Sequence, residues 1–278
     1  MSNAIKVAGV GDNTVDIYID SKEGFPGGNC VNFSVFAQRL GVEASYIGVL
    51  GKDENGKILS QALQNEGVNL QRIRFNEKEN AYTFVRHEKN DRVFIKSDPS
   101  TSQSLKIEKE DLDFLNDYNL IHSSIYSKIE IYLSDLNNLG CKISYDFSNK
   151  FSPQIIDEVL PWVDYAFFSW SGREEKDIIK FLRKWTSLHG TELVITNGSN
   201  GSYALVNGDL IHVPAEKIKP LDTMGGGDAY ISNYLICRLQ EKQIETSMKE
   251  ATKFAAESCL HKGSFGYKHV YQKIPGLK

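Results

Sequence analysis

The chain has 278 residues, of which 41% are hydrophobic and 24% are charged, so it is long enough to bury a core and unlike a disordered protein. With 32 Lys and Arg against 36 Asp and Glu, its formal net charge is −4. This balance argues against nucleic acid or an anionic membrane as a partner, because such proteins carry a basic surplus.

Short apolar runs alternate with helical stretches along most of the chain. Residues 30–40 illustrate the pattern, because Phe33, Phe36, Ala37 and Leu40 recur at helical spacing. Further helices are expected over residues 57–66, 129–138, 152–160 and 174–188, and strands over residues 5–10, 45–50, 120–124, 142–147, 165–169 and 192–196. Strands separated by helices of this length predict a mostly parallel central sheet that is covered on both faces.

Two pairs of consecutive strands interrupt this alternation. The first spans residues 81–97, and the second spans residues 202–213 with Asn207-Gly208 as its turn, a strong hairpin signal. The segment 15–20 is also strand-like and leads to a glycine loop. Small antiparallel pieces of this kind form either a lid over a cleft or surface decoration, and the sequence leaves both interpretations open.

The four cysteines are far apart and include no Cys-x-x-Cys pair, and the six histidines are scattered. Because zinc-ligand spacing is absent, we expect reduced thiols that behave as small apolar side chains. Residues 1–6 lack the charged start and apolar core of a signal peptide, and no apolar run approaches the roughly 20 residues of a membrane span. We therefore expect a cytoplasmic protein.

A glycine run before a predicted helix carries the sharpest chemical pattern. Gly225, Gly226 and Gly227 are followed by Asp228 and by apolar residues at helical spacing. Exposed N–H groups at a helix start bind anions such as phosphate, and glycine lets a ligand approach the backbone. Beside such an anion hole, Asp228 is suited to take a proton from a hydroxyl. The alternative is a flexible turn in which Asp228 only complements the helix dipole.

A second glycine pair precedes the helix expected over residues 30–40. Gly27 and Gly28 are followed by Asn29 and Asn32, which lie three residues apart and therefore share one helix face. Carboxamides both donate and accept hydrogen bonds, which suits sugar hydroxyls. Asn29 could instead be only the helix N-cap, whereas Asn32 is harder to explain by structure because Asn is a poor helix former.

Two further loops follow predicted parallel strands, where open α/β folds bind ligands. The first, residues 11–16, begins like a dinucleotide-binding fingerprint with Gly9-x-Gly11, but Thr14 stands where the third glycine is needed. An NAD-dependent oxidoreductase is therefore disfavoured, and no P-loop motif is present. The second loop, residues 196–201, is a strand end followed by glycine turns, and by itself this pattern is a weak indication of a binding site.

Together these segments resemble the PfkB (ribokinase-like) carbohydrate kinases. One family signature is matched from Gly27 to Gly51, although Cys30 departs from it, and the other is matched from Asp222 to Asp228. The resemblance covers essentially the whole chain. It implies an α/β protein with a three-layer α/β/α fold, a mostly parallel central sheet and a small β lid. It also implies one domain over residues 1–278, with lid strands from about 12–26 and 80–98.

The resemblance assigns roles at matching positions. Asp228 corresponds to the family's catalytic base, and the three glycines before it correspond to the anion hole. Residues at the sugar hydroxyls are implied to be Asp16, Gly28 and Asn32, and residues bordering the nucleotide are implied to be Thr196, Gly198 and Gly201. The implied cofactors are ATP and Mg²⁺, with a monovalent cation left open.

One family motif is missing. Where the family often has Asn-x-x-Glu near the metal and the phosphates, this chain has Ser169-Trp170-Ser171-Gly172. The metal ligands are therefore unknown from the sequence, although Glu174 or Glu175 could substitute. The missing motif slightly favours an alternative, a non-catalytic sugar-binding protein that kept the fold. The intact Asp228 argues against this alternative.

Finer motifs resemble the fructoselysine 6-kinase branch, which phosphorylates a sugar–amine adduct. They are Gly11-Asp12-Asn13-x-Val15-Asp16, Gly27-Gly28-Asn29-x-Val31-Asn32, Asn90-Asp91-Arg92-Val93-Phe94 and Asp222-Thr223-Met224-Gly225. Arg92 lies in the expected lid and could meet a substrate carboxylate, or could be an exposed strand charge. The alternative substrate is a plain sugar such as fructose or ribose. Exposed strand edges of a lid also make a homodimer through the lid plausible.

Overall fold

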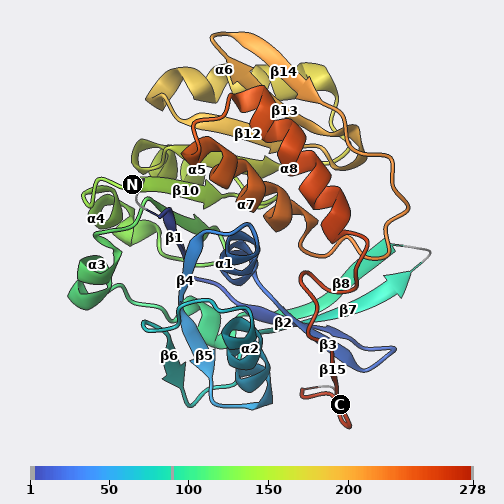
Figure 1. Cartoon of the computed structure of the whole chain (residues 1–278). Coiled ribbons are helices and arrows are strands. Elements are labelled where there is room, and N and C mark those ends of the chain that lie inside the picture. Colours follow the sequence, from blue (N-terminus) through green and yellow to red (C-terminus); the bar gives the residue numbers. More distant parts are fainter. Residues whose placement is uncertain (1–3, 89–90, 277–278) are drawn as a thin grey trace.

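The computed structural model describes residues 4–88 and 91–276, and within the helices and strands the side chains of residues 87, 88, 91, 92 and 187–189 are left out of the description. Its main sheet has eight strands in the order β14-β13-β12-β11-β10-β9-β1-β4 (Figure 1). Six of them, from β12 to β4 in this order, run parallel to one another. β13 runs antiparallel to β12, and β14 runs antiparallel to β13. The strands are β1 (Lys6–Val10), β4 (Glu43–Ile47), β9 (Leu120–Ser124), β10 (Lys142–Asp146), β11 (Tyr165–Ser169), β12 (Glu192–Thr196), β13 (Ser202–Val206) and β14 (Asp209–Val213).

Helices cover both faces of this sheet and bury two separate apolar cores. One core packs helices against one face through side chains such as Phe33, Tyr234 and Met248, and the other packs helices against the opposite face through side chains such as Leu136 and Leu182. The helices of the first face are α1 (Asn29–Arg39), α7 (Gly226–Leu239) and α8 (Ile244–Ser258), and those of the second are α3 (Lys109–Leu115), α4 (Leu133–Asn137), α5 (Pro153–Val159) and α6 (Glu175–His189). The three-layer α/β/α arrangement is therefore confirmed.

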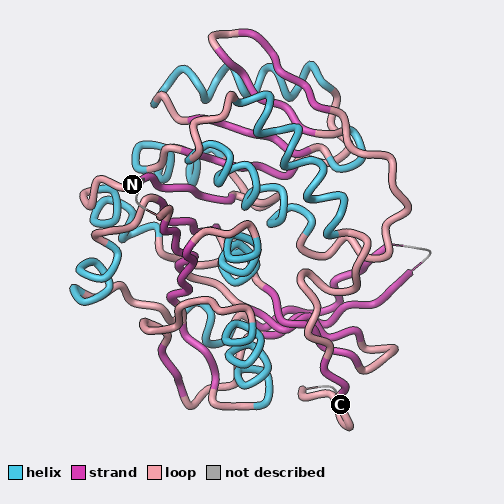
Figure 2. Tube along the Cα trace, in the orientation of Figure 1, coloured by secondary structure: helices cyan, strands magenta, loops and turns pink. Residues whose placement is uncertain are grey.

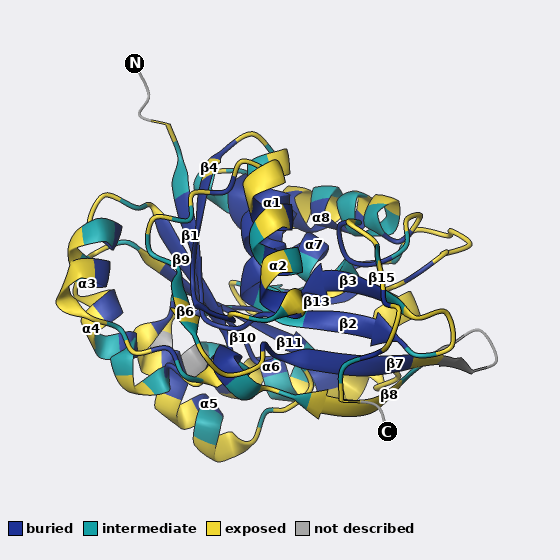
Figure 3. Cartoon of the chain, turned by 90° about the horizontal axis from the view of Figure 1, so that it is seen from below, coloured by how far each residue is buried: buried dark blue, intermediate teal, exposed yellow. Residues whose placement is uncertain are grey.

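A second sheet of five strands lies apart from the main one, in the order β15-β3-β2-β7-β8. In Figure 2 its strands run side by side at the lower right, and in Figure 3 β2 and β3 are largely buried. Its strands are β2 (Thr14–Tyr18), β3 (Glu23–Gly27), β7 (Tyr82–Glu88), β8 (Asp91–Asp98) and β15 (His269–Val270). The segments 12–26 and 80–98 thus do form strands outside the main sheet, and the end of the chain adds a strand that its sequence pattern did not indicate.

Some local expectations need correction. The strand expected over residues 45–50 is interrupted at Gly48, so its residues are divided between β4 and a separate strand, β5 (Val49–Gly51). β5 pairs with β6 (Arg74–Asn76). The helix expected over residues 129–138 begins as a 3-10 turn before α4. The helix expected over residues 57–66 begins earlier, as α2 (Glu54–Asn65), because the Asp53 carboxylate caps it by accepting from Gly56 N–H at 3.0 Å.

Two general expectations also hold for the described residues. All four cysteines are free thiols, three of them buried. Within residues 4–88 and 91–276, no helix is long and apolar enough to cross a membrane.

Candidate active site

The carboxylate of Asp228 meets the side chain of Asn32, a residue 196 positions earlier in the chain. Asp228 lies in the first turn of α7, and Asn32 lies in the first turns of α1. Asn32 Nδ2 donates to Asp228 Oδ2 at 2.6 Å and to Ser264 Oγ at 3.2 Å. The packing of α1 on α7 therefore unites the two glycine-led segments that the sequence singled out.

Asn29 makes an equivalent contact one helical turn earlier. Its Nδ2 donates to Asp146 Oδ2 at 2.5 Å, at the carboxyl end of β10. Gly28, not Asn29, is the N-cap of α1, so the interpretation of Asn29 as a mere cap is wrong. The face of α1 therefore presents two amides, each bound to a carboxylate.

Asp12 supports this arrangement from the loop after β1. Its Oδ2 accepts the backbone N–H of Asn29 at 2.8 Å. Its Oδ1 accepts the hydroxyls of Ser124 at 2.7 Å and Ser127 at 3.0 Å. Asp12 thus fixes the start of α1 against the ends of β1 and β9.

The crowding of these carboxylates changes their acidity. Burial raises the pKa of Asp228 to about 8, the hydrogen bond from Asn32 opposes this rise, and the negative charges of Asp146, Asp12 and Asp16 add to it. Burial likewise raises the pKa of Asp146 to about 7, against the hydrogen bonds that it accepts. A carboxyl group with a pKa near neutrality is suited to exchange a proton with a hydroxyl.

The glycine run lies where α7 begins. Gly225 is the N-cap residue and adopts a left-handed conformation with φ of 73°, which favours glycine. A Cβ built on Gly227 would meet no heavy atom of the described chain within 4 Å, so this position opens onto free space. The N–H of Gly226 donates to Thr223 O at 3.3 Å. The start of α7 therefore leaves its Gly227 end accessible to an anion.

Asp222, the first residue of the second signature, holds this loop in place. Its carboxylate accepts the Tyr18 hydroxyl at 2.5 Å, Met224 N–H at 3.0 Å and Gly263 N–H at 3.0 Å. Because Tyr18 belongs to β2, Asp222 ties the glycine run to the smaller sheet. Sequence reasoning quoted Asp222 only as part of a motif and did not anticipate this positioning role.

Asp16 in β2 lies on the same side of the site. A Cβ built on Gly27 would lie 2.9 Å from Asp16 Oδ2, 3.5 Å from Ser264 Oγ and 3.8 Å from Asn32 Oδ1. Gly27 therefore has no room for a side chain, and oxygens of Asp16, Ser264 and Asn32 converge on this position. Asp16, Gly28, Asn29, Asn32 and Asp228, which the sequence analysis selected, are brought together here.

The second glycine turn lies at the same edge of the main sheet, after β12. Thr196 ends that strand, and Gly198 begins a 3-10 turn that Gly201 closes. A Cβ on Gly201 would lie 2.1 Å from Val213 O, so close packing alone requires glycine there. The described contacts join this turn to the loop after β11, not to Asp228.

That loop replaces the missing Asn-x-x-Glu motif. The buried Asn197 side chain bonds both backbone groups of Arg173, at 3.3 Å and 2.9 Å, and the Arg173 guanidinium lies 5.2 Å from the Trp170 ring centroid. The loop lines a pocket of about 440 Å³. Its lining residues are Asn149, Phe151, Ser169, Trp170, Ser171 and Arg173.

The described residues form no metal site with three or more protein ligands. No group of three or more His, Cys, Asp or Glu side chains that could hold an ion occurs within residues 4–88 and 91–276. The two suggested substitutes, Glu174 and Glu175, are exposed at the start of α6, and Glu174 pairs with Lys176 at 2.5 Å. Arg92 lies in β8, but its side chain lies outside the described part of the chain.

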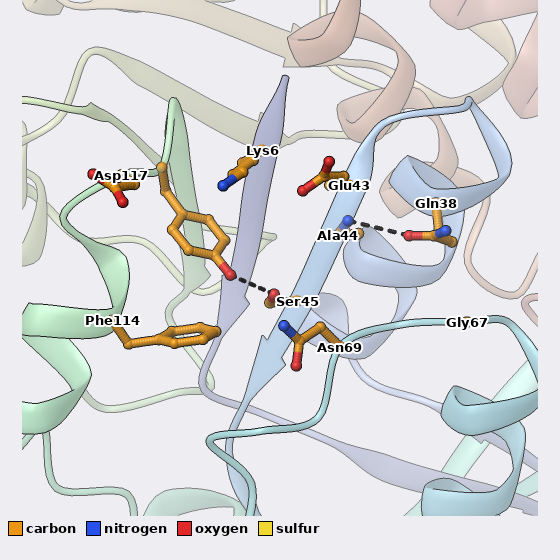
Figure 4. A pocket seen from close by; sticks show the side chains of 10 residues that line it. Lys6, Gln38, Glu43, Ala44, Ser45, Gly67, Asn69, Phe114 and Asp117 are labelled. Carbon is orange, nitrogen blue, oxygen red and sulfur yellow. Dashed lines mark hydrogen bonds between the residues drawn. The ribbon is translucent and has the colours of Figure 1, made fainter. Parts of the chain in front are cut away.

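A different pocket, of about 390 Å³, lies at the amino ends of β1 and β4 (Figure 4). There the hydroxyls of Tyr118 and Ser45 are 2.6 Å apart, and Lys6 and Glu43 flank them. Because Asp228 and its partners lie at the carboxyl ends of the strands, this pocket is not part of their site.

Comparison with known proteins identifies the family of this chain. Residues 5–266 match the family described as pfkB family carbohydrate kinase, so the chain belongs to that family of phosphotransferases. The similar proteins include fructosamine kinase FrlD of Bacillus subtilis (strain 168), 35% identical over 98% of this chain and 97% of that protein. They also include fructoselysine 6-kinase of Escherichia coli (strain K12), 28% identical over 93% of this chain and 99% of that protein.

Solved structures of ribokinase-like proteins share the fold. Arabidopsis thaliana ribokinase, determined with ribose and ATP, superposes with a TM-score of 0.80 at 19% identity, covering 94% of each chain. A putative ribokinase II from E. coli, determined with ATP and Mg²⁺, gives a TM-score of 0.77 at 20% identity, again over 94% of each chain. At these identities the likeness establishes the ribokinase-like fold alone.

Proposed function

We propose that this protein is an ATP-dependent fructosamine kinase that phosphorylates a primary hydroxyl of a substrate such as fructoselysine. The observation that carries the proposal is the Asp228 carboxylate, which lies at the accessible start of α7 and is bound by Asn32. The names of the two curated relatives supply the substrate class. Plain-sugar kinases, such as the fructokinase of Klebsiella pneumoniae at 26% identity, are more distant.

In this reaction the protein's own residues position the two substrates and accept a proton. Asp228 takes the proton of the hydroxyl, whose oxygen attacks the γ-phosphate in line. N–H groups at the Gly225–Gly227 turn face the charge that develops on the transferring phosphate. Asn32 and Asp16 hold sugar hydroxyls, because their oxygens converge near Gly27 on the side of the site where Asn32 contacts Asp228.

The nucleotide belongs at the other glycine turn. Thr196 and Gly198 lie next to Ser169 and Ser171 of the 440 Å³ pocket, and Arg173 is the one charged residue among the described residues of its lining. A guanidinium there suits the phosphates of ATP. A divalent ion would enter with those phosphates, because the described residues offer no preformed metal site.

The five-stranded sheet is suited to act as a lid. Asp16 and Gly27 connect its strands β2 and β3 directly to the site, so movement of this sheet would open or close the sugar-binding side. Closing would exclude water and limit ATP hydrolysis. The proposal also includes one domain over residues 1–278 and a homodimer in which two chains pair through this lid.

The test is ADP release in a coupled assay with fructoselysine, other fructosamines, fructose and ribose. We expect fructoselysine to exceed fructose in kcat/KM by at least about tenfold, the size of one charge-assisted hydrogen bond. If fructose or ribose were the better substrate, the fructosamine proposal would fail and the family assignment would stand. If no sugar stimulated ADP release, the protein would be a non-catalytic member of the fold.

A further inference from the structure

Three carboxylates gather around the first turns of α1, and all the donors described for them are neutral. Asp12 accepts two hydroxyls and a backbone N–H. Asp146 accepts the Asn29 amide and, through Oδ1, a backbone N–H at 2.8 Å. Asp228 accepts the Asn32 amide. Clustered negative charge away from water is unfavourable, so the site is completed best by an occupant that is positively charged.

An independent observation on the same helix face also points to a missing donor. Asn32 is only 3% exposed, and its Oδ1 is a buried atom without a hydrogen-bond partner. The amide cannot be turned round without placing that oxygen against the Asp228 carboxylate, because Nδ2 already donates there. The occupant must therefore bring hydrogen-bond donors as well as charge.

The spread of these groups favours an organic cation. The described residues contain no three-ligand group that could hold a metal ion, and the two amide–carboxylate pairs lie three residues apart on α1. Three residues of helix span roughly 4.5 Å. A substrate lying along this face would thus meet Asp228 at one end and Asp146 at the other.

We propose that Asp146, positioned by Asn29, binds the protonated amine of a fructosamine substrate while Asp228 faces its C6 hydroxyl. This inference rests on the proposed function. The amine of a fructosamine is on C1, at the opposite end of the hexose from C6, and as an alkyl amine it is charged at neutral pH. The two amide–carboxylate pairs therefore match the two ends of one substrate.

Asp146 suits this task better than Asp12 does. Asp12 accepts three hydrogen bonds and joins three segments of the chain, so it acts as a structural anchor. Asp146 accepts one hydrogen bond on each oxygen, and each carboxylate oxygen has a second acceptor site. An ammonium N–H can therefore be added without displacing either existing donor.

The first experiment needs no variant. The wild-type protein is given fructoselysine and an analogue in which an ether oxygen replaces the C1 amine and the tail is unchanged. We expect kcat/KM, and affinity by calorimetry without ATP, to fall about tenfold to a hundredfold for the ether. Equal use and equal binding of the two compounds would overturn the proposal.

The second experiment uses Asp146→Asn, which keeps the size of the side chain, with Asp157→Asn on the exposed surface of α5 as the matched control. Asp146→Asn should lose most of the discrimination between amine and ether, and activity with fructose should change much less. The control should retain wild-type discrimination. A variant that lost fructoselysine and fructose activity equally would show a structural role and overturn the proposal.

The binding measurement separates this inference from the proposed function. If the wild-type protein transferred no phosphate to any sugar, the proposed function would fail. In that case calorimetry would still show whether the wild-type protein binds the amine better than the ether. It would also show whether Asp146→Asn loses that preference. Amine recognition is therefore decided by binding even where turnover is zero.

Discussion

Asn32 Nδ2 and Asp228 Oδ2 are 2.6 Å apart, and this hydrogen bond joins the two helices that carry the family's signatures. Because Asn32 also donates to Ser264 at 3.2 Å, the amide is held from two sides. The carboxylate is thereby oriented before any ligand arrives, which is the geometry that a general base requires.

Asp228→Asn should reduce phosphoryl transfer by about a hundredfold to ten-thousandfold, because the amide cannot accept the proton of the substrate hydroxyl. Sugar affinity, measured by calorimetry, should stay close to wild type, and thermal stability should not fall, because the neutral amide replaces a buried carboxyl whose pKa is raised to about 8. Retention of more than about a third of the wild-type turnover would contradict the assignment of Asp228 as the base.

The pH dependence of kcat/KM should reflect the same group. Since a base must be ionised and burial raises the pKa of Asp228 to about 8, activity should rise with pH towards about 8. The Asn32 hydrogen bond lowers that pKa, so Asn32→Ala should move the rising limb to higher pH. A limb that stayed in place in this variant would show that another group controls the profile.

Gly227→Val should impair catalysis without unfolding the protein. A Cβ built here meets no described atom within 4 Å, so the backbone has room for a side chain, and that side chain would fill the space that an anion would occupy. We expect turnover to fall about a hundredfold to a thousandfold, as for the loss of an oxyanion donor, with sugar affinity retained. Equal losses in turnover and sugar binding would indicate a general structural defect. Gly226 is a poorer choice, because its Cβ would lie 3.0 Å from Cys259 Sγ.

Asp146→Asn should stabilise the protein at pH 8 more than at pH 5. Burial raises the pKa of Asp146 from 3.8 to about 7, so between these values the folded state holds a proton that the unfolded state has released. Stability therefore falls as pH rises through this window, and the neutral amide removes that loss. Each kcal/mol recovered should raise Tm by about 2–4 °C, measured by calorimetry at the two pH values. An identical Tm difference at both pH values would contradict the argument.

The protein should form a dimer through the edge strand β8 of the five-stranded sheet. Phe94 is 58% exposed and Ile95 is 47% exposed on this strand, which is unusual for large apolar side chains at a sheet edge. Size-exclusion chromatography with light scattering should give twice the chain mass for wild type and a smaller mass for Phe94→Lys. A wild-type protein that ran as a monomer at tens of micromolar would contradict this prediction.

The sequence by itself determined the layers of the fold and the identity of most candidate groups. The β11 and β12 boundaries were predicted to the residue, because apolar runs between helices of regular period leave few alternatives. α3 escaped notice because it is only seven residues long and mostly polar, with a capping box rather than an apolar stripe to mark it.

Only the tertiary structure decided which of these groups act together. Asp146 ends an unremarkable strand and belongs to no motif that sequence reasoning used, yet the parallel sheet brings it to Asn29, 117 residues away. In the same way, the packing of α1 against α7 makes Asn32 a partner of Asp228 rather than a poor helix residue. Local propensity and spacing are properties of residues that are neighbours in the sequence. Hydrogen bonds and charge interactions between distant segments depend instead on how the layers pack. The pKa shifts that these interactions cause in buried carboxyl groups therefore cannot be derived from spacing alone.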